Sequence, residues 1–388
     1  MQGDLRVLSE KDLPSDTRFS RGLPRRYNRR TLLKAALGLT AGSGAGSFLT
    51  TRAFAHSAET DGLLQAASAA IPAPTIGTPD LIVAGSPGTG PARWAPILAP
   101  SLETTLPTDG PLNLRNVVGQ DGVTGANLFD AQASGENALL VPGTAILAAL
   151  SGDSRVHFDY QRWLPVALVT GSPLVVGHVD FRRSLRTLLQ NRPVRVAVTT
   201  PTGAELPTLL AMAILSMRAI PVSGLATRDT SIEALQRGEV DVAQLSPGSA
   251  TPELLDALKA KGFVPLFSLT TDTGGSLPDF AGRFTSLRGH TPDHPLFPAY
   301  RAAAHAASIE AALVLPLLTP PANAALWRHA AHLTASLPSV DEVARSSHTR
   351  LTTEADVLPF YAALSPPLAS VLAFRRWLSA SSVSWRTG

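Results

Sequence analysis

The feature that most constrains the fold is an alternation, from Asp80 onwards, of short apolar runs with stretches of helical periodicity. We expect the runs to be strands at Leu81–Val83, Leu112–Val118, Ala138–Val141, Val194–Val198, Val240–Leu245 and Val264–Leu269. Strands that alternate with helices of about 10 to 15 residues build βαβ units around a parallel sheet. The sequence therefore predicts an α/β fold whose sheets are mostly parallel.

Helix signals are clearest after the fourth of these runs. Apolar residues recur at i, i+3, i+4 and i+7 over 206–217, and Pro207 falls in the first turn, where a missing N–H costs little. Thr319 is expected to cap a second helix, with proline just inside its start. Thr352 or Thr353 is expected to cap a C-terminal helical region that prolines 366 and 367 interrupt.

A chain of 388 residues with 44% hydrophobic residues is long enough for two domains with their own cores. We place the boundary near 171–173, between the apolar runs 164–169 and 174–179. The predicted division is a first lobe of 80–172 plus 265–388 and a second lobe of 173–264. Because the chain has no cysteine, disulfides, thiol catalysis and iron–sulfur clusters are excluded.

The basic character of the chain lies at its N-terminus. Residues 1–55 carry ten of the 33 basic residues and four of the 30 acidic ones, so the remaining 23 basic and 26 acidic side chains have a net charge of −3. A nucleic-acid-binding surface is therefore not expected. Residues 56–79 are rich in Ala, Pro and Thr and indicate a linker or wrapping arm.

Residues 1–55 have the pattern of a signal peptide. The stretch Asn28–Lys34 (NRRTLLK) is similar to the twin-arginine export signature, and Ala53–Ala55 has the small-residue pattern of a cleavage site. Lys34 and several glycines interrupt the apolar region, which argues against a membrane anchor. We expect export by the twin-arginine route, cleavage near Ala55 and a periplasmic mature protein.

No established enzyme motif is present. The chain lacks a Walker A sequence, an H-E-x-x-H sequence and a G-x-S-x-G elbow, and the dinucleotide-like Gly88-Thr89-Gly90 fails because Arg93 stands at the third glycine position. His329 and His332 could touch one metal from a helix, but ordinary surface histidines are the simpler interpretation. No cofactor and no catalytic activity are expected.

Three loops at the ends of predicted strands are rich in glycine and hydroxyl residues: 84–91, 142–144 and 199–203. Such loops can aim backbone N–H groups into one crevice, and the helix N-termini behind them favour negative charge. In open α/β sheets the ligand site lies outside the carboxyl ends of the strands. The sequence therefore favours binding of a small carboxylate, although turns of this kind also occur for purely structural reasons.

The order of these segments resembles the solute-binding proteins of the tripartite tricarboxylate transporter type, the Bug family. The similar stretches are Leu81–Pro91, which resembles a strand followed by P-G-G-P-T-D; Gly125–Leu128, G-G-N-I; Phe158–Val169, Y-D-P-x-x-D-F-x-P-V-A-L-V; Gly238–Ala243, G-x-V-D-V-x-F; and Leu317–Pro321, A-P-A-G-T-P. The resemblance implies a two-lobed periplasmic binding protein of type II-like fold. It implies a monomer that closes on a small organic acid and delivers it to a membrane permease of the tripartite tricarboxylate type.

The resemblance also implies the site residues. They are Ser86, Gly88, Thr89 and Gly90 in the first loop, Thr144 after the third strand, and Thr199, Thr200, Thr202 and Gly203 in the later loop. Arg93 could contact the ligand directly or be a solvated helix arginine, and Arg228 could reach the cleft unless its neighbours only cap a helix.

The chain departs from the family pattern in the same loops. Pro91-Ala92 replaces the T-D of the first loop, and Glu205 would repel an anion if it faced inward. Two alternatives therefore stay open. One is an exported enzyme or metal protein on the same fold, and the other is a diverged sensor or scaffold that acts through a partner protein.

Overall fold

The computed structural model describes residues 75–387 except 133–134, 180–192 and 271–276. The predicted signal peptide and most of the predicted linker lie outside the described residues. Ile76, at the end of that predicted linker, is fully buried and bridges to Thr108, so the packed region begins a few residues before the first strand.

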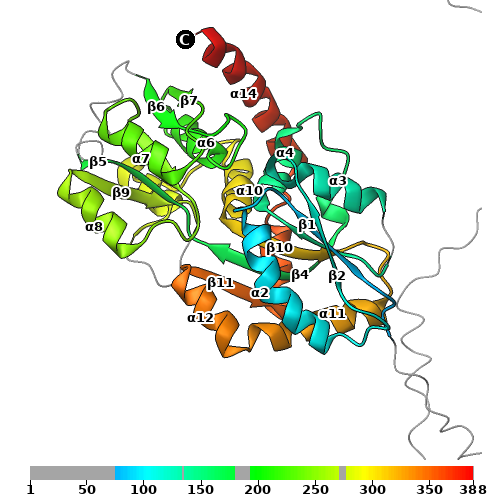
Figure 1. The fold of residues 1–388 in the computed structure, drawn as a ribbon. Helices are drawn as coiled ribbons and strands as arrows, with labels where there is room; N and C mark the ends of the chain where they lie inside the picture. The colour runs from blue at the N-terminus through cyan, green and yellow to red at the C-terminus, as the bar shows by residue number, and fades with distance from the viewer. Residues whose placement is uncertain (1–74, 133–134, 180–192, 271–276, 388) are drawn as a thin grey trace, which may run out of the picture. The chain divides into compact units, whose positions relative to one another are not determined.

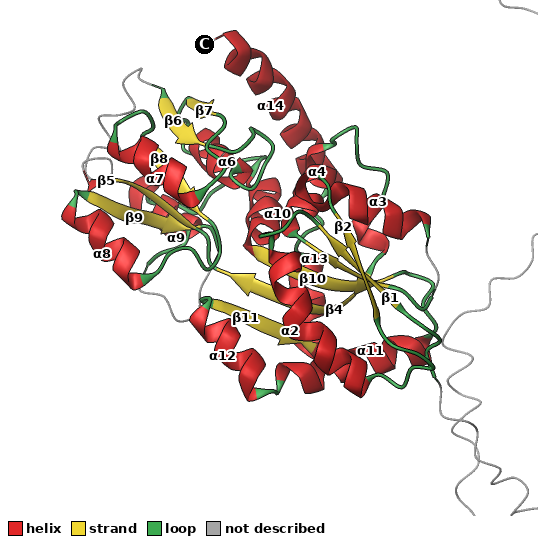
Figure 2. Ribbon diagram, in the orientation of Figure 1, coloured by secondary structure: helices red, strands yellow, loops and turns green. Residues whose placement is uncertain are grey.

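The first sheet contains six strands in the order β11-β4-β10-β3-β1-β2 (Figures 1 and 2). Its strands are β1 (Asp80–Ala84), β2 (Asn113–Val117), β3 (Ala138–Val141), β4 (Leu164–Gly171), β10 (Ile309–Leu315) and β11 (Thr349–Thr353). Strand β1 pairs in parallel with β2 and β3, whereas β10 is antiparallel to both β3 and β4. Strand β11 completes the sheet antiparallel to β4.

The second sheet contains five strands in the order β7-β6-β8-β5-β9. Its strands are β5 (Leu174–His178), β6 (Val194–Ala197), β7 (Ala219–Val222), β8 (Val242–Leu245) and β9 (Phe263–Ser268). Strand β6 is parallel to β7 and β8, and β5 is antiparallel to β8 and β9. The second sheet thus extends to Ser268, and the predicted end of the second lobe at residue 264 falls inside β9.

The α/β class with two sheets is confirmed, but both sheets are mixed rather than mostly parallel. The chain leaves the first sheet along β4, reaches β5 after only Ser172 and Pro173, and returns along β10. An outgoing and a returning strand that lie side by side must run in opposite directions. The antiparallel pairs β10·β4 and β5·β9 follow from this path.

Helices cover both sheets. They are α2 (Gly90–Thr105), α3 (Val123–Ala131), α4 (Gly143–Ser151), α6 (Leu206–Ile214), α7 (Arg228–Gln236), α8 (Pro252–Ala260), α9 (Phe280–Arg288), α10 (Phe297–Ser308), α11 (Pro321–Ala335), α12 (Pro338–Ser346), α13 (Val357–Ala362) and α14 (Leu368–Thr387). On the first sheet, α2 and α11 pack Trp94 and Trp327 against one face, and α3 and α4 cover the other. Helix α10 extends the core beneath α3 and α4 to α6 and to Phe280, the first residue of α9.

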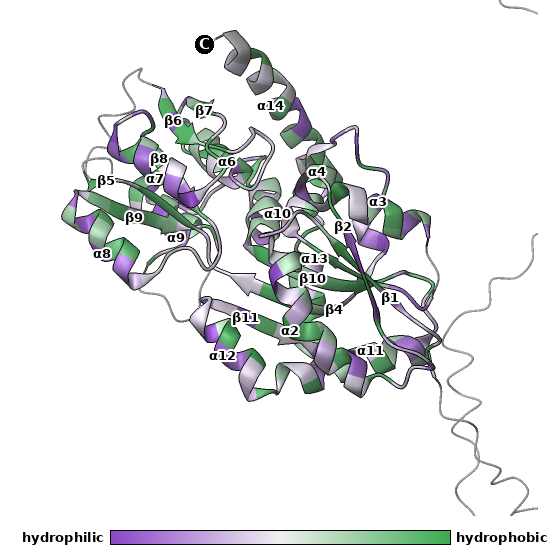
Figure 3. Ribbon diagram, in the orientation of Figure 1, coloured by the Kyte–Doolittle hydropathy of each residue, from purple (hydrophilic) through white to green (hydrophobic). Residues whose placement is uncertain are grey.

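The hydropathy of the strands, shown in Figure 3, agrees with their burial. Strand β10 is buried along its whole length and is drawn as hydrophobic, whereas edge strand β2 has mostly exposed side chains and is drawn as hydrophilic.

No helix in the described part of the chain is long and apolar enough to cross a bilayer. Helix α14 packs on α4 and α10 and also contacts the second sheet. That second contact is a hydrogen bond of 3.1 Å from Trp385 Nε1 to the main-chain oxygen of Ala219, in β7.

Two predicted helix caps are wrong. The Thr319 hydroxyl donates to the Pro316 oxygen at 2.8 Å, and Pro320 takes the N-cap position of α11. Thr352 and Thr353 lie in β11, which pairs with β4. Thr353 also precedes a 3-10 turn, but its side chain makes no cap hydrogen bond there. By contrast, Pro207 lies in the first turn of α6 as predicted, although this helix ends at Ile214.

Candidate functional site

The first predicted loop is a closed turn between β1 and α2. The Thr89 amide and hydroxyl both donate to the Ser86 oxygen, at 3.1 and 2.8 Å. Gly85 has φ of +127°, and a β-carbon there would lie 2.7 Å from Thr89 Oγ1, so only glycine fits. Pro87 and Gly88 are exposed. The loop thus presents its glycine backbone to solvent while the Thr89 hydroxyl proton is used within the turn.

The start of α2 packs directly on the backbone of β10. A β-carbon on Gly90 would overlap the main-chain oxygen of Glu310. One turn later, Arg93 Nη2 donates to Glu310 Oε2 in an ion pair. The Arg93 side chain is 56% exposed and that of Glu310 only 6%. Arg93 is therefore neither a free ligand contact nor a merely solvated arginine, because it neutralises a buried carboxylate.

Burial raises the pKa of Glu310, and the charge and hydrogen bond of Arg93 oppose that rise. Sequence reasoning missed this residue because it missed strand β10. The one sign of this strand in the sequence was the apolar run from Ala311 to Leu315, with Glu310 as an acidic residue directly before it. A buried carboxylate is strongly unfavourable without its cation.

The next strand ends of the first sheet contribute Asp121 and Thr144. Asp121 has φ of +52° in the turn between β2 and α3, and its main-chain oxygen accepts a hydrogen bond from Thr144 Oγ1 at 3.0 Å. A β-carbon on neighbouring Gly122 would lie 2.5 Å from Pro142 Cδ. Thr144 thus ties two strand-end loops together, and the Asp121 side chain is exposed beside them.

The corresponding loop of the second sheet is occupied by its own glutamate. The Thr199 amide donates to Glu205 Oε2 and the Thr199 hydroxyl donates to Oε1, both at 3.2 Å. The sequence raised Glu205 as an acid that would repel an anion if it faced inward. In the structure its carboxylate binds the loop's own donors.

Burial raises the pKa of Glu205, the hydrogen bonds from Thr199 oppose the rise, and the charge of Asp121 adds to it. Because Asp121 belongs to the first sheet and Glu205 to the second, strand-end loops of the two sheets lie within electrostatic reach of each other. A second close approach between the two sheets is at Gly248, which follows β8 of the second sheet. A β-carbon built on Gly248 would lie 3.7 Å from Glu310 Oε1 of strand β10, in the first sheet.

The rest of the 199–203 loop is compact. The Gly203 amide donates to the Thr200 oxygen at 3.0 Å, and Gly203 is buried. Thr200 is exposed and Thr202 half-buried. A β-carbon on Gly203 would lie 3.3 Å from Glu205 Oε2, so this glycine leaves room for the carboxylate.

Arg228 opens helix α7 and pairs with its neighbour. Its Nε donates to Asp229 Oδ1 at 2.9 Å, and both side chains are exposed. Thr227 and Thr230 form a capping box at this helix end, so the plainer capping interpretation holds for Thr230. No contact in the described residues joins Arg228 to the strand-end loops above.

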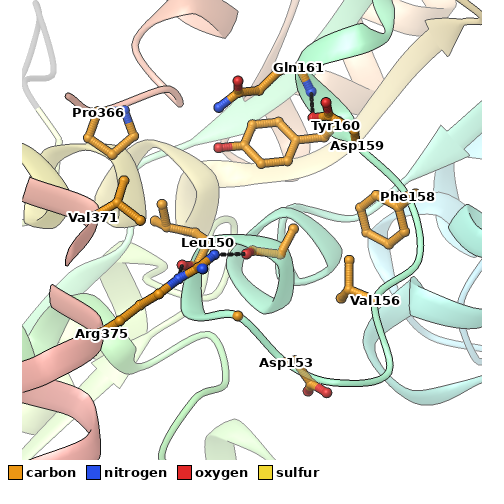
Figure 4. Close-up of a pocket in the computed structure, with 12 residues that line it drawn as sticks. Leu150, Asp153, Val156, Phe158, Asp159, Tyr160, Gln161, Pro366, Val371 and Arg375 are labelled. Carbon is orange, nitrogen blue, oxygen red and sulfur yellow. Dashed lines mark hydrogen bonds between the residues drawn. The ribbon is translucent and has the colours of Figure 1, made fainter. Parts of the chain in front are cut away.

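Two cavities in the described part of the chain lie away from these loops. One of about 360 Å³ lies between the end of α4, the 156–161 segment and α14 (Figure 4). In it Arg375 Nη2 and Nε donate to the main-chain oxygens of Ala149 and Leu150, at 3.4 and 3.5 Å, which satisfies the C-terminal end of α4.

The residues described here contain no cluster of three or more His, Asp or Glu side chains that could hold a metal. His332 Nδ1 lies 3.2 Å from Glu354 Oε1, with both side chains well exposed. The histidine therefore has an acidic neighbour that the sequence did not reveal, in a solvated pair.

No family model matches the sequence, and no curated protein matches it. Solved structures do match. A TctC solute-binding protein from Polaromonas is 13% identical with a TM-score of 0.57, over 78% of this chain and 98% of that one. The chain has the fold of the TctC and Bug solute-binding proteins. The periplasmic binding protein BugD is 16% identical with a TM-score of 0.51, over 80% of this chain and 99% of its own.

MatC from Rhodopseudomonas palustris, solved with bound malate, is 15% identical with a TM-score of 0.50, over 78% of this chain and 98% of its own. The matched chains are covered almost completely, so both sheets take part in the likeness. The resemblance to TctC and Bug proteins, predicted from the sequence, is thus confirmed for the fold. These similar proteins are binding proteins rather than enzymes by description.

Proposed function

We propose that this chain is an extracytoplasmic solute-binding protein that captures a small organic carboxylate and delivers it to a membrane permease of the tripartite tricarboxylate type. The observation that carries the proposal is the meeting of strand-end loops from the two sheets, linked by the Asp121–Glu205 interaction and by Gly248 beside Glu310. Ligands of open α/β sheets bind outside these strand ends. Malate bound to MatC, a protein of the same fold, indicates the ligand class.

In this proposal Ser86, Gly88, Thr89 and Gly90 form the first-sheet side of the site, and the 199–203 loop forms the second-sheet side. The positive end of α2, a helix of 16 residues, favours an anion at the first loop. Binding would close the two sheets' loops on the ligand by a hinge movement.

The experiment is a thermal-shift screen with mono-, di-, tri- and aromatic carboxylates, followed by calorimetry and small-angle scattering on each hit. We expect at least one acid to raise the melting temperature, bind with 1:1 stoichiometry and reduce the radius of gyration. Absence of any shift or compaction across the panel would contradict the proposal. Stoichiometric metal in protein purified from the periplasm would instead favour a metal enzyme on this fold.

Export is part of the proposal and has its own test. Replacing Arg29 and Arg30 by lysine should retain the full-length precursor in the cytoplasm, because the arginine pair defines the twin-arginine signal. Fractionation with an Arg25→Lys, Arg26→Lys control distinguishes the signal from general positive charge. Equal export of both variants would argue against this route.

One observation favours a second candidate function, a diverged member that acts through a partner protein. The donors of Thr199 and the guanidinium of Arg93 are already bound by the chain's own carboxylates. Crosslinking in the periplasm separates the two candidates. A permease subunit together with measurable acid binding supports transport, whereas a different membrane partner without acid binding supports the second candidate.

A further inference from the structure

The carboxylate of Glu205 is held as a ligand carboxylate would be. Two donors of one residue, the Thr199 amide and hydroxyl, each bind a different oxygen of the same carboxylate. Charge-assisted hydrogen bonds of this kind are stronger than neutral ones. A bound acid that sought the same two donors would have to displace Glu205.

The backbone around Glu205 holds its side chain close to this position. Glu205 directly precedes α6, and its main-chain oxygen accepts from the Thr208 amide at 3.0 Å. The following residue, Leu206, is fully buried. Gly203 leaves the space that the carboxylate fills. Displacing Glu205 would therefore break two hydrogen bonds without moving the helix that carries it.

The charges near this position also discriminate among ligands. The Asp121 carboxylate is within electrostatic reach of Glu205. These two groups carry a net charge of −2 when both are ionised. Coulombic repulsion scales with ligand charge, so a dianion is disfavoured twice as strongly as a monoanion.

We propose that Glu205 determines specificity by taking the place of a second ligand carboxylate, so that this chain binds monocarboxylates and rejects dicarboxylates. The inference rests on the proposed function and names its substrate class. The ligand's single carboxylate binds at the 86–90 loop, and the rest of the ligand faces Glu205.

The test uses 2-hydroxybutanoate and malate, two acids with the same four-carbon chain. The terminal methyl group of the first is a second carboxylate in malate. Calorimetry on the full chain should give at least about tenfold tighter binding of 2-hydroxybutanoate, a difference of about 1.4 kcal/mol. Glu205→Ala frees both donors and removes the charge, so we expect malate binding to tighten at least about tenfold. Glu205→Gln removes the charge but keeps an oxygen for the Thr199 amide, so its gain should be smaller.

Glu342→Ala, at an exposed position of α12, is the matched control and should leave both affinities unchanged. Equal binding of the two acids by the unaltered chain, or unchanged malate binding by Glu205→Ala, would overturn the role of Glu205 while leaving the proposed function intact. Binding of neither acid by any variant would also count against this role of Glu205, and the proposed function would then depend on the wider carboxylate panel.

A second measurement needs no ligand and guards against a variant that fails to fold. Hydrogen exchange at the Thr199 amide should be slow in the unaltered chain, because that amide is bonded to Glu205. Exchange should become fast in Glu205→Ala while the buried β6 amides stay protected. Unchanged exchange in a folded variant would show that the carboxylate does not hold this loop.

Discussion

The main-chain oxygen of Glu310 lies where the side chain of any residue at position 90 other than glycine would begin. Strand β10 and the first turn of α2 therefore meet at van der Waals distance, beside the loop on which the proposed function depends. The closeness also brings Arg93 within reach of the Glu310 carboxylate.

Gly90→Ala should destabilise the chain, because the start of α2 must move away from β10. Overpacking of this kind costs about 1–3 kcal/mol, measurable as a lower urea midpoint. Gly88→Ala is the control, since its β-carbon meets nothing within 4 Å although φ is +89°. For Gly88→Ala we expect only the smaller loss of stability that comes from placing a β-carbon on a residue with positive φ. Equal losses for both variants would show that contact with β10 is unimportant.

Arg93→Ala should lower stability at pH 7 by about 1–3 kcal/mol, because it leaves a buried carboxylate without its partner. Burial already raises the pKa of Glu310, and removing Arg93 raises it further. Between the ordinary and the raised pKa the folded state binds a proton that the unfolded state does not, so stability falls as pH rises. The deficit should therefore shrink in mild acid.

The control for that measurement is the double variant Arg93→Ala, Glu310→Gln, which has no buried charge. The difference in free energy of unfolding between this double variant and the unaltered chain should not shrink in mild acid as the deficit of Arg93→Ala does. A deficit of Arg93→Ala that is independent of pH would mean that Glu310 is not the group left unpaired.

Glu205→Gln should change how stability depends on pH. Because burial raises the pKa of Glu205 in the folded chain, the unaltered protein gains stability relative to this variant as pH falls through the raised value. Above that value the neutral glutamine avoids the repulsion from Asp121 and the variant should be relatively more stable. Chemical denaturation at several pH values checks the sign, and the opposite trend would contradict the burial of this carboxylate.

Trp385→Phe should weaken the attachment of α14 to the second sheet. The indole donates to the Ala219 oxygen, and loss of one such bond costs about 0.5–1.5 kcal/mol. We expect faster amide exchange in β7 with little change in β1. Trp377→Phe, which keeps the Trp385 bond, is the comparison, and equal exchange in both variants would argue against the attachment.

The strands and loops that carry strong local signals were predictable. Runs such as Ala138–Val141 are apolar throughout, with turn-forming or helix-starting residues on either side. The sequence alone therefore indicates that they are strands and where they lie. Strand β10 was missed because it continues the alanine-rich helix α10 without a break, from Ser308 to Ile309. Helix formers on both sides of that junction give no local sign that pairing with β3 and β4 ends the helix.

The candidate site was predictable in its loops but not in its contacts. Glycine and hydroxyl residues marked the strand ends, and Glu205 stood out as an acid that would repel an anion if it faced inward. Its bond to Thr199 depends on the loop's three-dimensional path, and the partner of Arg93 lies 217 residues away in the sequence. Such long-range pairs have no signature in one sequence.

The passage from β4 to β5 has a mechanical consequence. Only Ser172 and Pro173 separate the last residue of one sheet from the first of the other, and proline fixes one backbone torsion. Few backbone bonds can rotate at this crossing, so it restrains how far one sheet can turn against the other, together with the return along β10 and the Trp385–Ala219 bond. Inserted glycines here would loosen one of these restraints without touching any side chain of the ligand loops.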